Sequence, residues 1–212
     1  MKLKIHEIFH SLQGESTRVG LPTVFVRLTG CPMRCVYCDT AYAFSGGSNV
    51  EITDILEQVA EFGAQYVTVT GGEPLAQKDC HGLLKALCDA GYSVSLETGG
   101  AIDISPVDAR VSVILDIKTP GSGEVKNNVW GNLAHLKNTD EVKFVLCDRA
   151  DYEWAKDILA THHLADKCAV LFSPVYGKVN PAELAGWVLA DRLPVRMQVQ
   201  LHKILWGEVA GK

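Results

Sequence analysis

The feature that most constrains the fold is an alternation of β-rich and helix-periodic segments along the chain. The predicted strands are short runs rich in β-branched residues, and the predicted helices carry apolar residues at three- and four-residue spacing. This alternation predicts an α/β fold around a parallel sheet, either doubly wound or barrel-like. Strands are expected at 24–29, 66–70, 92–97, 111–117, 141–146, 169–172 and 196–199, and helices at 52–62, 83–91, 152–162 and 180–189.

Two local signals refine this pattern. Asn180 is a suitable N-cap, with Pro181 in the first helical position. No long helix is predicted between Pro120 and Asp140, so the helical layer should be thin there and leave an apolar edge that favours dimerisation. Because no Pro/Ser-rich linker or repeat divides the chain, we predict a single domain over residues 1–212.

Composition excludes several classes of protein. Hydrophobic residues make up 47% of the 212 residues and charged residues 21%, which excludes general disorder. The net charge of −5 argues against nucleic-acid binding, which requires a basic face. There is no signal-peptide pattern and no apolar run of about 18 residues, so a soluble cytoplasmic protein without a membrane span is expected.

Three of the seven cysteines lie within eight residues, as the CxxxCxxC of Cys31, Cys35 and Cys38. Soft thiolates suit zinc or an iron–sulfur cluster, and structural zinc usually needs a fourth protein ligand that this loop lacks. Three cysteines on a four-iron cluster would leave one iron open to bind a small molecule. A zinc site completed by a distant Cys or His is the alternative. The other cysteines are expected to be buried bystanders: Cys80, Cys88, Cys147 and Cys168.

The cysteine motif, with Tyr37 before its last cysteine, resembles that of the radical S-adenosylmethionine (SAM) enzymes. The Gly71-Gly72-Glu73-Pro74 segment, about 30 residues further on, resembles the GGEP motif of the same superfamily. Further segments narrow the resemblance to the 7-carboxy-7-deazaguanine synthases, the QueE family. These segments are SLQGE (11–15), FVRL (25–28), YCDT (37–40), LETGG (96–100), DIKTP (116–120) and QVQLHK (198–203).

The resemblance implies a fold, an activity and a set of cofactors. The fold is a radical SAM partial (β/α)6-type barrel, here with a reduced helical layer. The activity is that of a lyase in queuosine and 7-deazapurine biosynthesis, which converts 6-carboxy-5,6,7,8-tetrahydropterin to 7-carboxy-7-deazaguanine with loss of ammonia. A 5′-deoxyadenosyl radical formed from SAM starts the ring contraction. The cofactors are a [4Fe–4S] cluster, SAM and Mg2+, and the partners are a second copy of the chain and a flavodoxin- or ferredoxin-type reductant.

The resemblance also assigns roles to individual residues. It places the cluster on Cys31, Cys35 and Cys38 and magnesium on Thr40, and it identifies no catalytic side chain, since the radical arises from SAM. SAM is expected to contact Tyr37, Cys38, Asp39, Gly71, Gly72, Glu73, Gly100, Lys118, Thr119 and Ser173. The substrate is expected to contact Leu12, Gln13, Gly14, Glu15, Arg27, Thr98 and His202.

The chemistry of the substrate agrees with these assignments. A flat heterocycle with a carboxylate calls for amide and carboxylate partners at the ring edge, which Gln13 and Glu15 offer, and for a bidentate cation, which Arg27 offers. Each residue also has a plain structural interpretation, such as a turn cap for Thr40 or a packed histidine for His202.

Two rival functions remain open at this stage. The first is another radical SAM enzyme, such as a glycyl-radical activating enzyme, which would lack the LQGE, FVRL and QLHK segments. The second is a zinc-stabilised interaction module without enzymatic activity. Feeding the carboxylated tetrahydropterin tests the first rival, which would form no ammonia or deazaguanine. Anaerobic reconstitution tests the second, because an iron–sulfur protein is brown and a zinc protein is colourless.

Overall fold

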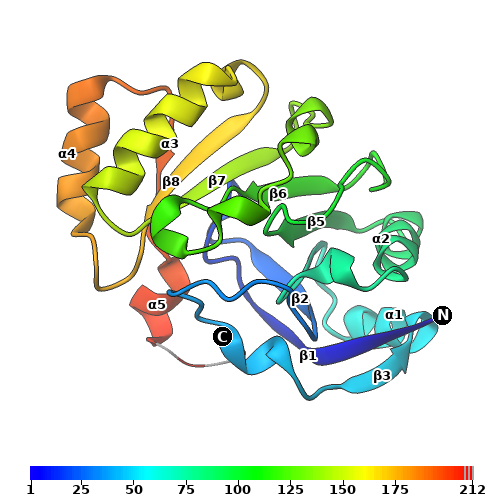
Figure 1. Cartoon of the computed structure of the whole chain (residues 1–212). Helices are drawn as coiled ribbons and strands as arrows, with labels where there is room; N and C mark the ends of the chain where they lie inside the picture. The colour runs from blue at the N-terminus through cyan, green and yellow to red at the C-terminus, as the bar shows by residue number, and fades with distance from the viewer. Residues whose placement is uncertain (208, 210, 212) are drawn as a thin grey trace.

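The computed structural model describes residues 1–207, 209 and 211, and across these residues nine strands form a single sheet (Figure 1). The strand order is β3-β1-β2-β4-β5-β6-β7-β8-β9. From β2 to β9 every neighbouring pair is parallel, whereas β1 is antiparallel to both β2 and β3. The strands are Lys2–Leu12, Pro22–Leu28, Ser48–Glu51, Tyr66–Gly71, Ser93–Thr98, Ser112–Asp116, Glu141–Leu146, Ala169–Pro174 and Arg196–Met197.

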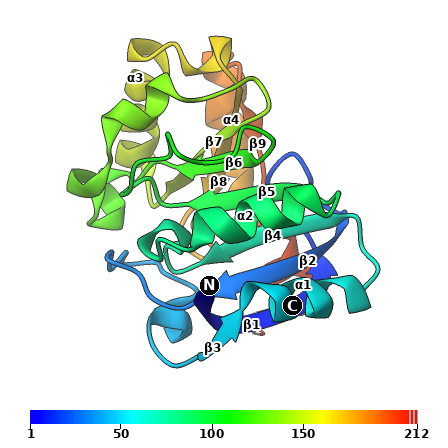
Figure 2. The same ribbon diagram turned by 90° about the vertical axis from the view of Figure 1, so that its right-hand side faces the viewer.

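The sheet is open, because its last strand does not pair with its first, and this confirms the predicted partial barrel. Helices α1 (Ile52–Glu61) and α2 (Cys80–Asp89) lie beside each other, α1 against β1 and β3 and α2 against β5 (Figure 2). Helix α3 (Arg149–Thr161) packs on β7, and α4 (Pro181–Asp191) packs beside β9. Apolar side chains from both layers form one buried cluster between helices and sheet.

The predicted cap of α4 is confirmed. The Asn180 side chain accepts a hydrogen bond from the Ala182 backbone N–H at 2.8 Å, and Pro181 opens the helix. Helix α3 begins three residues earlier than expected, because the Asp148 side chain caps it by accepting from the Asp151 N–H at 2.9 Å.

The stretch from Pro120 to Asp140 carries only short 3₁₀ helices: η3 (Pro120–Ser122), η4 (Val125–Asn127) and η5 (Trp130–Ala134). The predicted thin helical layer is therefore confirmed at this point. Val129 and Trp130 are about 40% exposed in this stretch, so apolar surface is present there. Dimerisation through this edge stays a prediction.

Sequence patterns missed three elements. Strand β1 has eleven residues and begins with the alternation of buried Leu3 and Ile5 with exposed lysines, a signal that was present but not used. Strand β3 has four residues, and helix α5 (Leu201–Trp206) has six residues, none of them buried. Elements this short have no recognisable period. No helix in the described part of the chain is long and apolar enough to cross a bilayer.

Candidate active site

A cavity of about 690 Å³ lies at the carboxyl ends of the parallel strands. Its wall combines the loop after β1, the cysteine loop after β2, the ends of β4, β5 and β6, and α5. Parallel barrels place their active sites at this end of the sheet. Sixteen of the sequence-predicted site residues line it: Leu12, Gln13, Gly14, Glu15, Arg27, Cys31, Cys35, Tyr37, Cys38, Asp39, Thr40, Gly71, Gly72, Thr98, Lys118 and His202.

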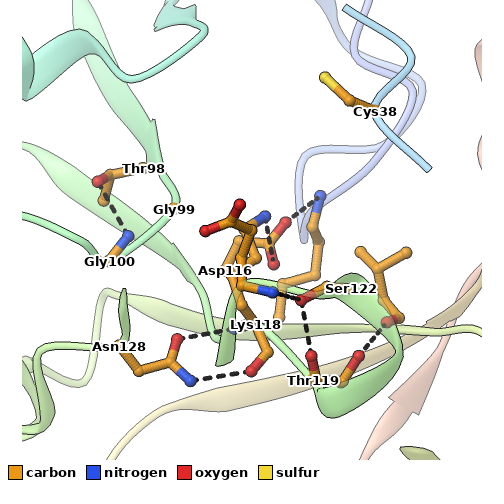
Figure 3. Close-up of polar contacts among 12 residues, drawn as sticks. Cys38, Thr98, Gly99, Gly100, Asp116, Lys118, Thr119, Ser122 and Asn128 are labelled. Carbon is orange, nitrogen blue, oxygen red and sulfur yellow. Dashed lines mark hydrogen bonds and ion pairs between the residues drawn. The ribbon is translucent and has the colours of Figure 1, made fainter. Parts of the chain in front are cut away.

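The cysteine loop is a turn that is hydrogen-bonded to the loop after β6. The Cys38 N–H donates to the Cys35 carbonyl at 3.1 Å, and the Val36 N–H donates to the Ser122 carbonyl at 3.0 Å. Burial raises the pKa of the Cys35 thiol to about 11, so binding to a metal centre would require the loss of this proton. Figure 3 shows Cys38 on this loop, across the cavity from Thr98 and Asp116.

The donor set suits an iron–sulfur cluster. All three motif cysteines are free, partly buried and on the cavity wall. Among the described residues, no group of three or more His, Cys, Asp or Glu side chains is gathered around a point where one ion would sit. A zinc ion draws its ligands onto one centre, whereas a cubane cluster offers each cysteine its own iron.

Two glycines form the wall next to this loop. A Cβ on Gly72 would overlap the Gly30 carbonyl and the Cys31 side chain. Gly71 has a φ of 157°, and a Cβ there would overlap the Leu28 backbone. Only glycine lets the end of β4 pack this closely against the start of the cysteine loop. The sequence motif therefore has a packing role here in addition to any ligand contact.

Glu73, Gly100, Thr119 and Ser173 do not line the cavity. Glu73 is fully buried, and the buried Thr119 hydroxyl donates to Asp151 at 2.8 Å. Gly100 lies behind Thr98, whose hydroxyl accepts its N–H at 3.3 Å (Figure 3). The Ser173 hydroxyl is buried at the end of β8 without a hydrogen-bond partner among the described residues. A role for these four at SAM stays a prediction.

A chain of alternating charges crosses the floor of the cavity. Lys143 forms ion pairs with Glu15 at 2.5 Å and with Asp116 at 3.5 Å, and Asp116 lies 3.1 Å from the Lys118 ammonium. Burial alone would raise the pKa of Glu15, but the Lys143 ammonium outweighs it and lowers this pKa to about 2. Glu15 is therefore ionised at neutral pH. Asn128 fixes the Lys118 backbone through two hydrogen bonds (Figure 3).

The Arg27 guanidinium is held by the protein through its Nε edge. Its Nε donates to Glu7 at 2.7 Å, and Tyr42 donates its hydroxyl to the same carboxylate oxygen at 2.8 Å. The guanidinium also lies 5.7 Å from the Phe9 ring centre and 5.8 Å from that of Tyr42. Within the described residues its two terminal nitrogens have no protein acceptor, so they can bind a carboxylate in a bidentate manner.

Helix α5 closes one side of the cavity against the loop after β1. The Leu201 N–H donates to the Gly14 carbonyl at 2.9 Å, and His202 packs so closely on Gly14 that a Cβ there would overlap its ring. Gln200 donates to Glu15 at 2.8 Å and to Asp39 at 3.3 Å. Residues far apart in the sequence are thus joined at one edge of the site.

Sequence reasoning missed several residues of this wall. A signal existed for Lys143, because it is a cation between the apolar residues Val142 and Phe144 of strand β7. Glu97 immediately precedes the predicted Thr98. Asp116 and Gln200 lie in the DIKTP and QVQLHK segments, whereas Phe9 and Tyr42 offered no signal, because only the folded chain brings them to the cavity. The missed residues include Phe9, Tyr42, Thr70, Glu97, Asp116, Lys143 and Gln200.

Comparison with known proteins agrees with this geometry. The Radical SAM superfamily model matches residues 25–118, which include the cysteine loop and the Gly71-Gly72 turn. A 7-carboxy-7-deazaguanine synthase of Chlorobaculum tepidum is 49% identical over 97% of this chain and 94% of its own length. The chain belongs to the 7-carboxy-7-deazaguanine synthase family. A synthase of Koribacter versatilis is 41% identical, over 96% of this chain and 97% of its own.

A solved structure supports the fold of this synthase family member. The crystal structure of QueE from Escherichia coli superposes with a TM-score of 0.78, over 95% of each chain, at 24% sequence identity. At this identity the likeness concerns the fold alone, and it confirms the partial barrel. Membership of the radical SAM superfamily implies a [4Fe–4S] cluster and SAM, which the loop of Cys31, Cys35 and Cys38 suits by its donors.

Proposed function

We propose that this protein is a 7-carboxy-7-deazaguanine synthase, a radical SAM lyase of 7-deazapurine and queuosine biosynthesis. Its substrate is 6-carboxy-5,6,7,8-tetrahydropterin, and its products are 7-carboxy-7-deazaguanine and ammonia. The observation that carries this proposal is the meeting of two sets of residues in one cavity. The first set is the cysteine loop with the Gly71-Gly72 turn, and the second is the Gln13–Glu15 loop with Arg27 and His202.

The cysteine side of the cavity would hold the cofactors. Cys31, Cys35 and Cys38 would bind the cluster, and SAM would lie beside Tyr37 and Lys118. Burial lowers the pKa of Lys118, but the Asp116 carboxylate outweighs it and keeps this pKa above its ordinary value, so the side chain stays cationic. A cation here suits the carboxylate of SAM. When bound, the cluster and SAM supply the 5′-deoxyadenosyl radical.

The opposite side would hold the substrate. Arg27 would bind the substrate carboxylate through its free terminal nitrogens, while Glu7 keeps the guanidinium in place. Glu15, ionised through Lys143, and the neighbouring His202 would face the heterocycle. The product and ammonia together contain every atom of the substrate, so the overall conversion is neither an oxidation nor a reduction. The site therefore needs no further co-substrate for the overall balance.

A magnesium ion would complete the substrate site. Thr40 lines the cavity between the cysteine loop and Arg27's neighbour Tyr42, and it offers a hydroxyl oxygen, the type of donor that magnesium prefers. Its Oγ1 is 3.7 Å from the Cys38 Sγ, which would put the ion close to the cluster and the bound carboxylate. Release of magnesium by a chelator should lower turnover without bleaching the cluster.

Several properties of the protein in the cell follow from the same family resemblance. A single radical SAM domain over residues 1–212 is supported by the one sheet and the one buried apolar cluster that the described residues form. We further propose a cytoplasmic homodimer served by a flavodoxin- or ferredoxin-type reductant. The acidic composition is consistent with a small-molecule substrate rather than nucleic acid.

Anaerobic reconstitution with iron and sulfide, followed by turnover, tests the proposed function. The wild-type protein should become brown and convert the carboxylated tetrahydropterin to the deazaguanine with release of ammonia. Alanine at Cys31, Cys35 or Cys38 should abolish both the colour and turnover. Cys147→Ala is the matched control, because Cys147 is also a free, partly buried thiol and is expected to retain both. A brown wild-type protein that forms no ammonia would rule out this substrate.

A further inference from the structure

Glu97 lies in one row with Arg27 across three neighbouring strands. Arg27 on β2 is paired in register with Thr70 on β4. The Thr70 hydroxyl donates to the Glu97 carboxylate on β5 at 2.9 Å. Thr70 and Glu97 are the residues that follow the paired Val69 and Leu96 on these two strands. Neighbouring strands are about 4.8 Å apart, so the two ends of the row are about 10 Å apart at the backbone. All three residues line the cavity.

The side chains predicted to contact the ring edge are already engaged with the protein. The Gln13 amide nitrogen donates to Glu97 at 3.2 Å and to Thr68 at 3.3 Å, and its oxygen accepts from the Glu15 N–H. Glu15 has Lys143 on one carboxylate oxygen and Gln200 on the other. A ligand at either side chain would therefore compete with these contacts.

Glu97 differs from Glu15 in the nature of its partners. Each of its two oxygens accepts one hydrogen bond from a neutral donor, Gln13 or Thr70, so each retains a second acceptor position. Within the described residues no cation forms an ion pair with it. Burial, together with the nearby Glu15 charge, raises the pKa of Glu97, so the carboxylate gains from additional N–H donors.

We propose that Glu97 is a specificity-determining residue that accepts hydrogen bonds from the 2-amino and ring N–H edge of the pterin. Arg27 then binds the substrate carboxylate at the other end of the row. The separation of the two residues is comparable with the long dimension of a two-ring heterocycle that carries a carboxylate. This inference rests on the proposed function, because it concerns the same substrate in the same cavity.

Binding selectivity tests this proposal. The probes are 6-carboxytetrahydropterin and its counterpart without the 2-amino group, titrated calorimetrically and anaerobically into SAM-loaded enzyme. Wild-type protein should bind the 2-amino compound about tenfold to a hundredfold more tightly, the range expected for hydrogen bonds to a charged group. Glu97→Gln, which keeps the shape but offers an amide, should bind the two compounds nearly equally. Glu57→Gln, on the exposed face of α1 and outside the cavity, is the control and should keep the wild-type preference.

The outcomes are distinct. Equal binding of both compounds by the wild-type protein overturns the role of Glu97 without any variant, so a Glu97→Gln protein that fails to fold does not block the test. Retention of the preference by folded Glu97→Gln, or an equal loss of it in the Glu57→Gln control, also overturns it. Wild-type protein that binds neither compound and forms no ammonia overturns the proposed function as well.

Discussion

The Glu73 carboxylate accepts the Thr98 hydroxyl at 2.9 Å on each of its two oxygens, and so ties the end of β4 to the end of β5. The same carboxylate accepts the Gly99 N–H at 2.8 Å and the Leu75 N–H at 3.1 Å. Glu73 was predicted to contact SAM, yet it lies behind the cavity wall that Thr98 and Gly99 form. It can therefore act on a ligand by holding that wall in position.

Glu73→Gln should destabilise the protein and distort this wall. An amide nitrogen in place of one oxygen would face N–H and O–H donors, which costs about 1–3 kcal/mol for a buried group. Urea unfolding measures the loss, and SAM binding to the folded variant should be weaker. The substitution Glu57→Gln, at an exposed position of α1, is the control and should change neither quantity. Unchanged unfolding of Glu73→Gln would contradict the arrangement.

Gly14→Ala should separate helix α5 from the cavity. The added methyl group would overlap the His202 ring, which must move and take the Leu201–Gly14 hydrogen bond with it. KM for the substrate is expected to rise by about tenfold or more, since loss of one such bond and its contacts costs about 1–2 kcal/mol. Gly131→Ala provides a comparison, because open space surrounds that glycine. Equal KM values in the two variants would count against a role of α5 at the substrate.

Thr119→Val should affect folding more than SAM binding. The Thr119 hydroxyl donates to Asp151, which also accepts from the Gly121 N–H at 2.8 Å and the Cys147 N–H at 2.9 Å. Loss of one donor to this buried carboxylate should lower the free energy of unfolding by about 1–3 kcal/mol. SAM affinity, measured by equilibrium dialysis, should change less than threefold, or by roughly 0.6 kcal/mol. A much larger loss of affinity would contradict this and support the direct contact predicted from the sequence.

The ion pair of Glu15 and Lys143 should make stability depend on pH in the acid range. The pKa of Glu15 is about 2 in the folded protein, below its ordinary 4.5, so the ionised carboxylate stabilises the fold above about pH 4.5. This contribution is lost as the pH falls from 4.5 through 2. The difference in unfolding free energy between wild type and Glu15→Gln, about 3 kcal/mol at neutral pH, should shrink accordingly. A difference that stays constant down to pH 2 would exclude this ion pair as its source.

Local patterns were sufficient for much of the fold. The period of apolar residues located α1, with Ile52, Ile55 and Val59 buried as expected, and the Asn180-Pro181 pair located the start of α4. These signals predict the structure correctly because helix period and capping depend on neighbours within a few residues. Strand β1 was missed although its alternation was readable, and α5 was missed because six residues without a buried face carry no period.

By itself, the sequence determined the chemistry of this protein. The spacing of Cys31, Cys35 and Cys38 and the glycines after β4 are short-range features, and they point to an iron–sulfur enzyme before any fold is known. Only the tertiary structure decided which polar groups are committed to the protein and which remain available to a ligand. The Gln13 amide donates to Glu97, and the Lys143 ammonium donates to Glu15. Each contact joins segments more than 80 residues apart in the sequence. Pairing over such distances depends on strand order and register, which no local pattern encodes.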